Sequence, residues 1–115
     1  MKLWRLRKNF EFQRVYKAGG SKAAHNIAMY VMPNGLTVNR LGVSVSKKVG
    51  GSVVRSRVKR LVIESYLRAE ERTHKGYDIL VVARARAASS DFDAIRRSYD
   101  YLLYQHNVLP KKEQA

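Results

Sequence analysis

The stretch from Ser46 to Arg68 constrains the fold of this chain more than any other part of the sequence. Apolar or small side chains recur there at helical spacing and form one stripe, made by Val54, Val58, Leu61, Val62 and Ser65. Gly50 and Gly51 precede the stripe, and Ser52 is a residue type that caps helix N-termini. The stretch therefore predicts a strand end, a glycine turn and a helix that packs one face on the rest of the protein.

The other faces of this predicted helix are cationic. Positions 47 to 60 hold six basic residues and no acidic one: Lys47, Lys48, Arg55, Arg57, Lys59 and Arg60. On a helical period the four cations of the helix itself flank the apolar stripe on both sides: Arg55, Arg57, Lys59 and Arg60. The N-terminus of a helix attracts anions, so arginines there are unfavourable unless a phosphate binds. A solvated face that only aids solubility is the alternative; the choice of arginine favours phosphate recognition.

The charge of the whole chain agrees with a polyanionic partner. Its 115 residues include 23 Lys and Arg against 9 Asp and Glu, a net charge of +14. Such a field attracts nucleic acid or, less specifically, an anionic membrane. Because 45% of the residues are hydrophobic, we expect one folded domain over residues 1–115, with a disordered tail at about 111–115.

The sequence contains no cysteine, which excludes disulfides and thiolate zinc sites and fits a reducing compartment. No apolar stretch approaches the roughly 18 residues that span a bilayer. We therefore expect a soluble, cytoplasmic protein that does not bind a membrane.

Further elements are indicated by periodicity. Residues 8–18 predict a short helix, with Asn9 as its N-cap and glycines after it. Residues 27–32 and 40–46 alternate as strands do, and residues 78–83 are almost continuously apolar, as in a central strand. A last helix begins near Asp91, with Arg96 and Arg97 facing out and an inward stripe of Phe92, Ile95, Tyr99, Leu102 and Leu103. The strand, helix and strand over 40–83 predict a parallel pair, for which a right-handed crossover is the general rule.

Residues suited to acid–base catalysis are scattered along the chain. They are His25, His74, His106, Glu64, Asp91 and Asp93, and no metal-binding spacing or phosphate-binding glycine loop joins them. We therefore expect no catalytic residue, no metal site and no small-molecule substrate in this chain.

The central stretch resembles the signature of the bacterial ribonuclease P protein subunit, a strand ending in SVSKK followed by a glycine turn and an Arg-x-Arg-x-x-Arg helix. The matching residues are Ser44 to Gly50 and Arg55 to Leu61. The opening LRKNFEFQRVYKAG, the segment IAMYVMPN and the late segment DILVVARARAA also look like the family, in the same order. The resemblance thus covers most of the chain.

This resemblance implies a fold. It is an α+β single-domain sandwich of a small mixed sheet with helices, in the order α-β-β-β-α-β-α, similar to that of a ribosomal protein. It also implies that the β-α-β crossover is left-handed, contrary to the general rule.

The resemblance further implies a function as the protein subunit of ribonuclease P, in which the RNA subunit, with bound Mg²⁺, removes the 5′ leader of precursor tRNA. The residues that match the RNA-binding signature are Lys47, Lys48, Arg55, Ser56, Arg57, Lys59 and Arg60. Phe12, Tyr16 and Tyr30 match the family's leader-binding positions, where exposed rings suit a single strand. From the sequence alone, core packing is the better interpretation of Phe12 and Tyr16.

Three positions depart from the family pattern. Ser56 and Gly51 replace asparagines, and Ile63 stands where an arginine is common. A serine lacks the planar amide, so a base-edge contact at position 56 is in doubt. Two other functions stay open: a ribosomal or general RNA-binding protein, and a DNA-binding protein, although cations on both sides of a buried stripe suit a helix packed on a sheet better than one in a major groove.

Overall fold

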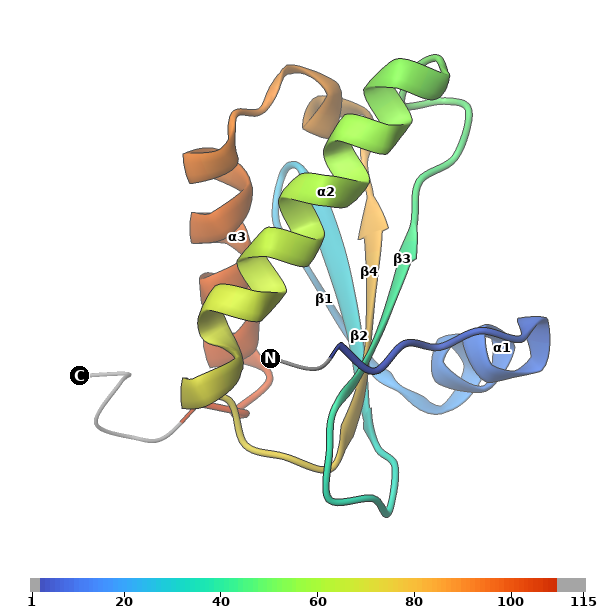
Figure 1. Ribbon diagram of the computed structural model, residues 1–115, viewed down its shortest axis with the longest axis vertical. Coiled ribbons are helices and arrows are strands. Elements are labelled where there is room, and N and C mark those ends of the chain that lie inside the picture. The colour runs from blue at the N-terminus through green and yellow to red at the C-terminus, as the bar shows by residue number, and fades with distance from the viewer. Residues whose placement is uncertain (1–2, 110–115) are drawn as a thin grey trace.

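The computed structural model describes residues 3–109, which form a four-stranded sheet with three α-helices and two 3-10 turns (Figure 1). In chain order the elements are α1 (Asn9–Ala18), β1 (Gly20–Ala23), β2 (Ile27–Pro33), β3 (Arg40–Ser44), α2 (Ser52–Ala69), η1 (Glu70–Arg72), β4 (Tyr77–Ala83), η2 (Ala85–Ser89) and α3 (Phe92–Gln105). The order of helices and strands confirms the predicted α+β fold. The predicted tail at 111–115 lies outside the described residues.

The sheet has the strand order β1-β2-β4-β3. β4 is a central strand, as its continuous apolar run predicted, and pairs antiparallel with β2 and parallel with β3. In Figure 1, with α2 in front and both strands pointing up, β4 lies to the left of β3. The β3-α2-β4 crossover is therefore left-handed, as the resemblance implied.

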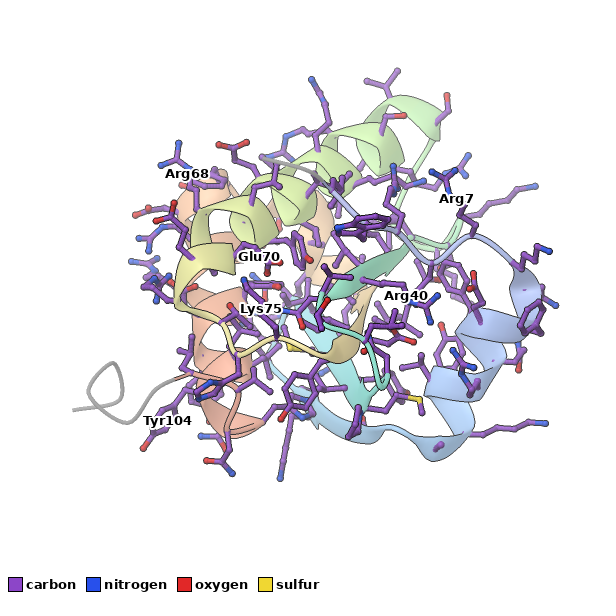
Figure 2. All side chains as sticks on the ribbon, turned by 60° about the horizontal axis from the view of Figure 1, so that its bottom comes forward. Arg7, Arg40, Arg68, Glu70, Lys75 and Tyr104 are labelled. Atoms are coloured by element: carbon purple, nitrogen blue, oxygen red, sulfur yellow. The ribbon has the colours of Figure 1, made fainter. Side chains whose placement is uncertain are left out.

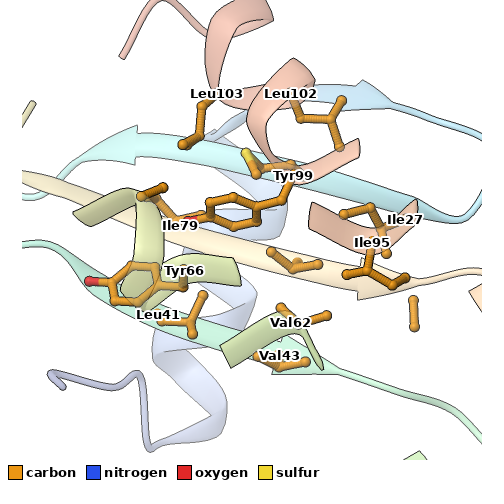
Figure 3. Packing of buried hydrophobic residues seen from close by; sticks show 14 of the residues in the cluster. Ile27, Leu41, Val43, Val62, Tyr66, Ile79, Ile95, Tyr99, Leu102 and Leu103 are labelled. Carbon is orange, nitrogen blue, oxygen red and sulfur yellow. The ribbon is translucent and has the colours of Figure 1, made fainter. Parts of the chain in front are cut away.

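One face of the sheet carries the main hydrophobic core. Alternate residues of β2, β3 and β4 point to this face and pack against α2 and α3. Tyr66 of α2 and Tyr99 of α3 are almost fully buried there, with their rings 6.5 Å apart in an edge-to-face arrangement (Figure 3). The buried residues of α2 are Val58, Val62, Ser65, Tyr66 and Ala69. Three residues of the predicted stripe are thus buried, Val54 and Leu61 are partly buried against the same core, and the stripe continues for one more turn.

Among residues 3–109, α1 and the segment before it cover the other face of the sheet. Its buried apolar residues are Leu6, Val15 and Leu80, with half-buried side chains around them. The segment before α1 runs beside β3, where Leu6 N donates to Leu41 O at 3.0 Å. Gly42 makes this packing possible, because a β-carbon there would lie 2.8 Å from Leu6 Cδ1 and 3.0 Å from Phe12 Cε2.

Several predicted boundaries were wrong by one or two residues. The N-caps of α1 and α2 are Lys8 and Gly51, not Asn9 and Ser52, and neither cap makes a side-chain hydrogen bond. α1 is instead started by the Glu11 carboxylate, which accepts from Arg7 N at 2.7 Å and Lys8 N at 2.9 Å.

Two further differences concern the sheet and α3. β3 ends at Ser44 rather than residue 46, because the chain turns toward α2, and the short exposed strand β1 had no sequence signal that we recognised. Phe92 is only half-buried, and the Arg68 guanidinium lies 5.1 Å from the centre of its ring.

Candidate nucleic-acid interface

The basic surface starts in the turn between β3 and α2. Lys47 and Lys48 are both exposed in this turn. Gly50 closes it against the first turn of α2, since a β-carbon at Gly50 would lie 2.9 Å from Val54 Cγ1. The two lysines are thereby held beside the N-terminus of α2, whose first turn has no acidic residue.

The first half of α2 forms a shallow basic hollow with the end of β3. The hollow has a volume of about 150 Å³ and is lined by Val45, Ser52, Arg55, Ser56 and Lys59. Arg55 is half-buried and its Nε donates to Gly50 O at 3.1 Å. Ser56, Lys59 and the neighbouring Arg60 are exposed. The structure thus brings three of the predicted RNA-binding residues together around one hollow.

Arg57 lies on the other flank of the buried stripe and contacts the protein itself. Its guanidinium donates to Ser90 O at 2.6 Å and to Ala88 O at 3.5 Å. These carbonyls belong to the segment that joins β4 to α3. Part of the donor capacity of Arg57 therefore fixes this segment to the basic helix, a role that its sequence neighbours do not indicate.

The three predicted leader residues meet on the opposite face of the sheet. Tyr16 of α1 and Tyr30 of β2 have ring centroids 5.1 Å apart, with an angle of 73° between the ring planes. Phe12 lies over Gly42 of β3. All three rings are half-buried, so each packs on the α1 face and also keeps surface open to solvent. The rings can therefore serve both packing and stacking.

A buried ion cluster, which we did not predict, holds α1 to the sheet. Asp78 of β4 is fully buried and accepts from Arg40 Nε and Nη2, both at 2.8 Å, and from Asn34 Nδ2 at 3.0 Å. Arg40 Nη1 also donates to Glu11 Oε2 at 2.9 Å, and Arg14 contacts Asp78 at 3.4 Å. Arg40 lies on the side of the sheet that faces α1 (Figure 2). The available signal was a lone Asp in an otherwise apolar strand, since a buried carboxylate requires a cationic partner.

The charges of this cluster shift its proton equilibria. Burial alone would raise the pKa of Asp78, but hydrogen bonds from Arg40 and Asn34 and the nearby arginine charges hold that pKa below its ordinary value. The pKa of Glu11 is lowered mainly by the backbone N–H groups of Lys8 and Arg7. Both carboxylates are thus held ionised at neutral pH.

Two of the candidate acid–base residues, His25 and Asp91, line the same hollow. Over residues 3–109, no three His, Asp or Glu side chains are placed to hold a metal ion. His106 is half-buried, with Nε2 3.0 Å from Met29 O, and burial lowers its pKa. Within the same range, no helix is both long and apolar enough to cross a membrane.

Comparison with known proteins identifies what this chain resembles. The family model described as Ribonuclease P matches residues 1–107. The ribonuclease P protein component of Caldanaerobacter subterraneus subsp. tengcongensis is 48% identical over 113 residues, which are 98% of this chain and 97% of that protein. The corresponding protein of Clostridium botulinum is 46% identical, over 94% of this chain and 98% of its own length.

Solved structures agree with the sequence matches. The RNase P protein of Staphylococcus aureus superimposes with a TM-score of 0.86 at 34% identity, over 95% of this chain and all (100%) of that chain. The RNase P protein of Thermotoga maritima gives a TM-score of 0.80 at 30% identity, over 88% of this chain and 96% of that one. Sequence and fold therefore point to the same family.

Proposed function

The chain belongs to the family of ribonuclease P protein components, the protein subunits of the endoribonuclease that forms tRNA 5′ ends, and we propose that it binds the catalytic RNA with one face and the 5′ leader of precursor tRNA with the other. One observation carries this proposal: the basic half of α2 and the aromatic cluster lie on opposite faces of one sheet. A single small domain can thus contact two RNA molecules at once.

The RNA subunit contacts the basic face in this proposal. The residues involved are those of the signature: Lys47, Lys48, Arg55, Ser56, Arg57, Lys59 and Arg60. The hollow beside Lys59 takes a phosphate, where the acid-free helix N-terminus and the cationic side chains act together. Arg57 contributes charge and also keeps the segment at Ser90 in place.

The leader contacts the aromatic face. Phe12, Tyr16 and Tyr30 present partly open rings, and stacking on rings suits a single strand because every base has a π-face. Mature tRNA lacks the leader and cannot make these contacts. The protein thereby favours substrate over product.

Catalysis resides in the RNA subunit in this proposal, and Mg²⁺ is bound mainly by that RNA. Residues 3–109 provide no cluster of side chains that fits a metal ion. The protein instead supplies cations that reduce repulsion between phosphates near the catalytic core, so that fewer free metal ions are needed to hold the folded, substrate-bound state.

The experiment that tests this function measures precursor-tRNA cleavage by a bacterial ribonuclease P RNA at low Mg²⁺, with and without the protein. We expect cleavage only when both are present. Lys59→Gln/Arg60→Gln should reduce it, whereas Arg72→Gln/Lys75→Gln, which removes the same charge beyond the C-terminal end of α2, should not. Cleavage by the protein alone would overturn the assignment of catalysis to RNA. Tight RNA binding without any effect on cleavage would indicate a general RNA-binding protein.

The leader contact is tested by comparing the affinity of the holoenzyme for precursor and mature tRNA. Tyr16→Ala should weaken precursor binding while mature tRNA binding is unchanged, and Tyr16→Phe, which keeps the ring, should retain the preference. An equal loss for both tRNAs would assign Tyr16 to packing alone.

A further inference from the structure

Two adjoining hollows lie away from both proposed surfaces, between α3 and the turn that joins β1 to β2. The first has a volume of about 360 Å³ and is lined by His25, Arg86, Ser89, Arg97 and neighbouring residues. The second, of about 510 Å³, shares His25 and Arg97 and adds Tyr101. These volumes are within the range of small-ligand sites. Because His25, Ala94 and Arg97 line both hollows, the two adjoin and are called the groove below.

The first hollow is cationic and its arginines are uncommitted. Within residues 3–109, neither Arg86 nor Arg97 has an ion-pair partner. Asp91 also lines the hollow, but its Oδ1 is occupied as the N-cap of α3, accepting from Ala94 N at 2.9 Å. Free guanidinium groups beside the Ser89 hydroxyl form a surface complementary to phosphate.

The second hollow has the character of a base-binding surface. Tyr101 is 53% exposed although it belongs to a helix whose other face is buried. The hollow beside it is lined by small apolar side chains, among them Ala23, Ala24 and Ala94. An exposed ring over a small apolar surface next to a cation suits stacking of an unpaired base.

The groove is physically linked to the basic helix. The Arg57 guanidinium binds the Ser90 carbonyl, and Ser90 itself lines the first hollow. In Figure 1 the start of α2, the η2 turn, the start of α3 and the turn after β1 all lie at the upper end of the molecule. An RNA bound on α2 can therefore continue over η2 into the groove.

We propose that this groove, formed by His25, Arg86, Arg97 and Tyr101, is a second RNA contact that holds an unpaired nucleotide of the catalytic RNA. Its phosphate lies between Arg86 and Arg97, and its base stacks on Tyr101. This inference rests on the proposed function, because it assumes that ribonuclease P RNA is the partner. It adds a site outside the signature and outside the leader face, and makes Arg57 the residue that positions it.

The first test measures the salt dependence of ribonuclease P RNA binding by the full chain. Loss of one phosphate contact lowers the slope of log K against log salt by about 0.7 to 0.9, so Arg86→Gln/Arg97→Gln should lower it by about 1.4 to 1.8. The charge-matched control Arg72→Gln/Lys75→Gln should leave the slope unchanged. Equal slopes for the two double variants would overturn the phosphate site.

The second test separates stacking from charge. Tyr101→Ala should weaken RNA binding by about 5-fold to 150-fold, the effect of losing one stacked base, while Tyr101→Phe should bind like the parent. Because this side chain is largely exposed, both variants should unfold at the same temperature as the parent. Parental affinity of Tyr101→Ala would overturn the base site.

A third measurement needs no variant. His25 and His74 are both exposed; His25 belongs to the turn between β1 and β2, and His74 to the segment between η1 and β4. In Figure 1 these two segments lie toward opposite ends of the sheet. Diethylpyrocarbonate should modify both in the free protein, and the bound RNA should protect His25 but not His74. Equal reactivity of His25 in free and bound protein would overturn the groove. The proposed function has a separate test: it is overturned if Lys59→Gln/Arg60→Gln leaves RNA binding unchanged, whatever the result for the groove.

Discussion

The two faces of the sheet are stabilised by different physical means. The face under α2 and α3 buries apolar side chains from both helices and three strands, whereas the cluster on the α1 face has three buried apolar residues within 3–109: Leu6, Val15 and Leu80. On that second face, the ion cluster around Asp78 and the half-buried rings complete the packing. A thin core leaves aromatic surface open for a ligand, and a thick core lets the outer side of its helices carry charge. The two proposed RNA-binding surfaces follow from this difference.

The largest expected effect comes from removing the carboxylate at the centre of the α1 face. Asp78→Ala leaves the Arg40 guanidinium without its buried partner and should lower the free energy of unfolding by about 3 to 5 kcal/mol. Urea denaturation measures this loss, and hydrogen exchange should increase more in α1 than in α3. Asp93→Ala, which removes an exposed carboxylate paired with Arg96, should cost about 1 kcal/mol or less. Equal losses of unfolding free energy for the two variants would contradict a stabilising role of the buried ion cluster.

Neighbouring residues of β4 allow a direct comparison of the two cores. Ile79 points into the main core and Leu80 to the α1 face, and both are fully buried. Ile79→Ala should lower the free energy of unfolding by about 3 to 5 kcal/mol, and Leu80→Ala by about 2 to 3 kcal/mol, because the half-exposed rings can relax into the space. A larger cost for Leu80→Ala would show that the α1 face is the more tightly packed.

The two faces should lose stability in different pH ranges. His106, at the end of α3, has a pKa below 6.5 in the folded protein, mainly because burial disfavours its charged form. The unfolded chain therefore binds this proton more strongly, and stability falls as the pH drops below 6.5. The pKa values of Asp78 and Glu11 are lowered from their ordinary values of 3.8 and 4.5. The stability that these two carboxylates contribute is therefore complete above the ordinary values and is lost as the pH falls below them.

Urea unfolding across the pH range from about 8 to 3 tests this separation, with the sign given by proton linkage. His106→Gln should remove the loss of stability that begins near neutral pH and should keep the loss at acidic pH. Glu11→Gln should reduce the acid decline only. The idea of separate ranges fails if both variants alter the same part of the curve.

The smallest effect on stability is expected on the outer side of α2. Lys59→Gln and Arg60→Gln change exposed side chains, so each should alter the free energy of unfolding by no more than about 0.5 kcal/mol. Each should nevertheless lower the salt slope of RNA binding by about 0.7 to 0.9. A large loss of stability would show that these cations pack against the protein, as Arg57 does.

Much of the fold could be predicted from the sequence. The apolar stripe along α2 and the apolar run of β4 could be predicted because each depends on residues only a few positions apart in the chain. The order of the helices and strands followed from the family resemblance. The resemblance implied a strand at the place of β1 in this order, but the sequence did not locate it, because GSKA is short, exposed and without alternation. The N-caps were displaced by one residue, because Glu11 and the glycine turn, rather than cap side chains, define the helix starts.

The candidate site was predicted only in part. The residues of the signature and the three leader rings were named from the sequence, and the structure places them on two separate faces. The sequence showed no partner for Arg57, no cluster around Asp78 and no groove at His25. Each of these depends on residues far apart in the chain: Arg57 and Ser90, Arg40 and Asp78, or His25 and Arg97.

The sequence by itself determined which segments are helical or extended, which faces are apolar, and that the chain carries a strong positive charge. These properties depend on local periodicity and composition, which are fixed by the sequence whatever the tertiary arrangement. Only the tertiary structure decided which cations are open to solvent and which donate to backbone carbonyls. That choice depends on the left-handed crossover and on the order β1-β2-β4-β3, which bring distant segments together and leave other side chains open to solvent.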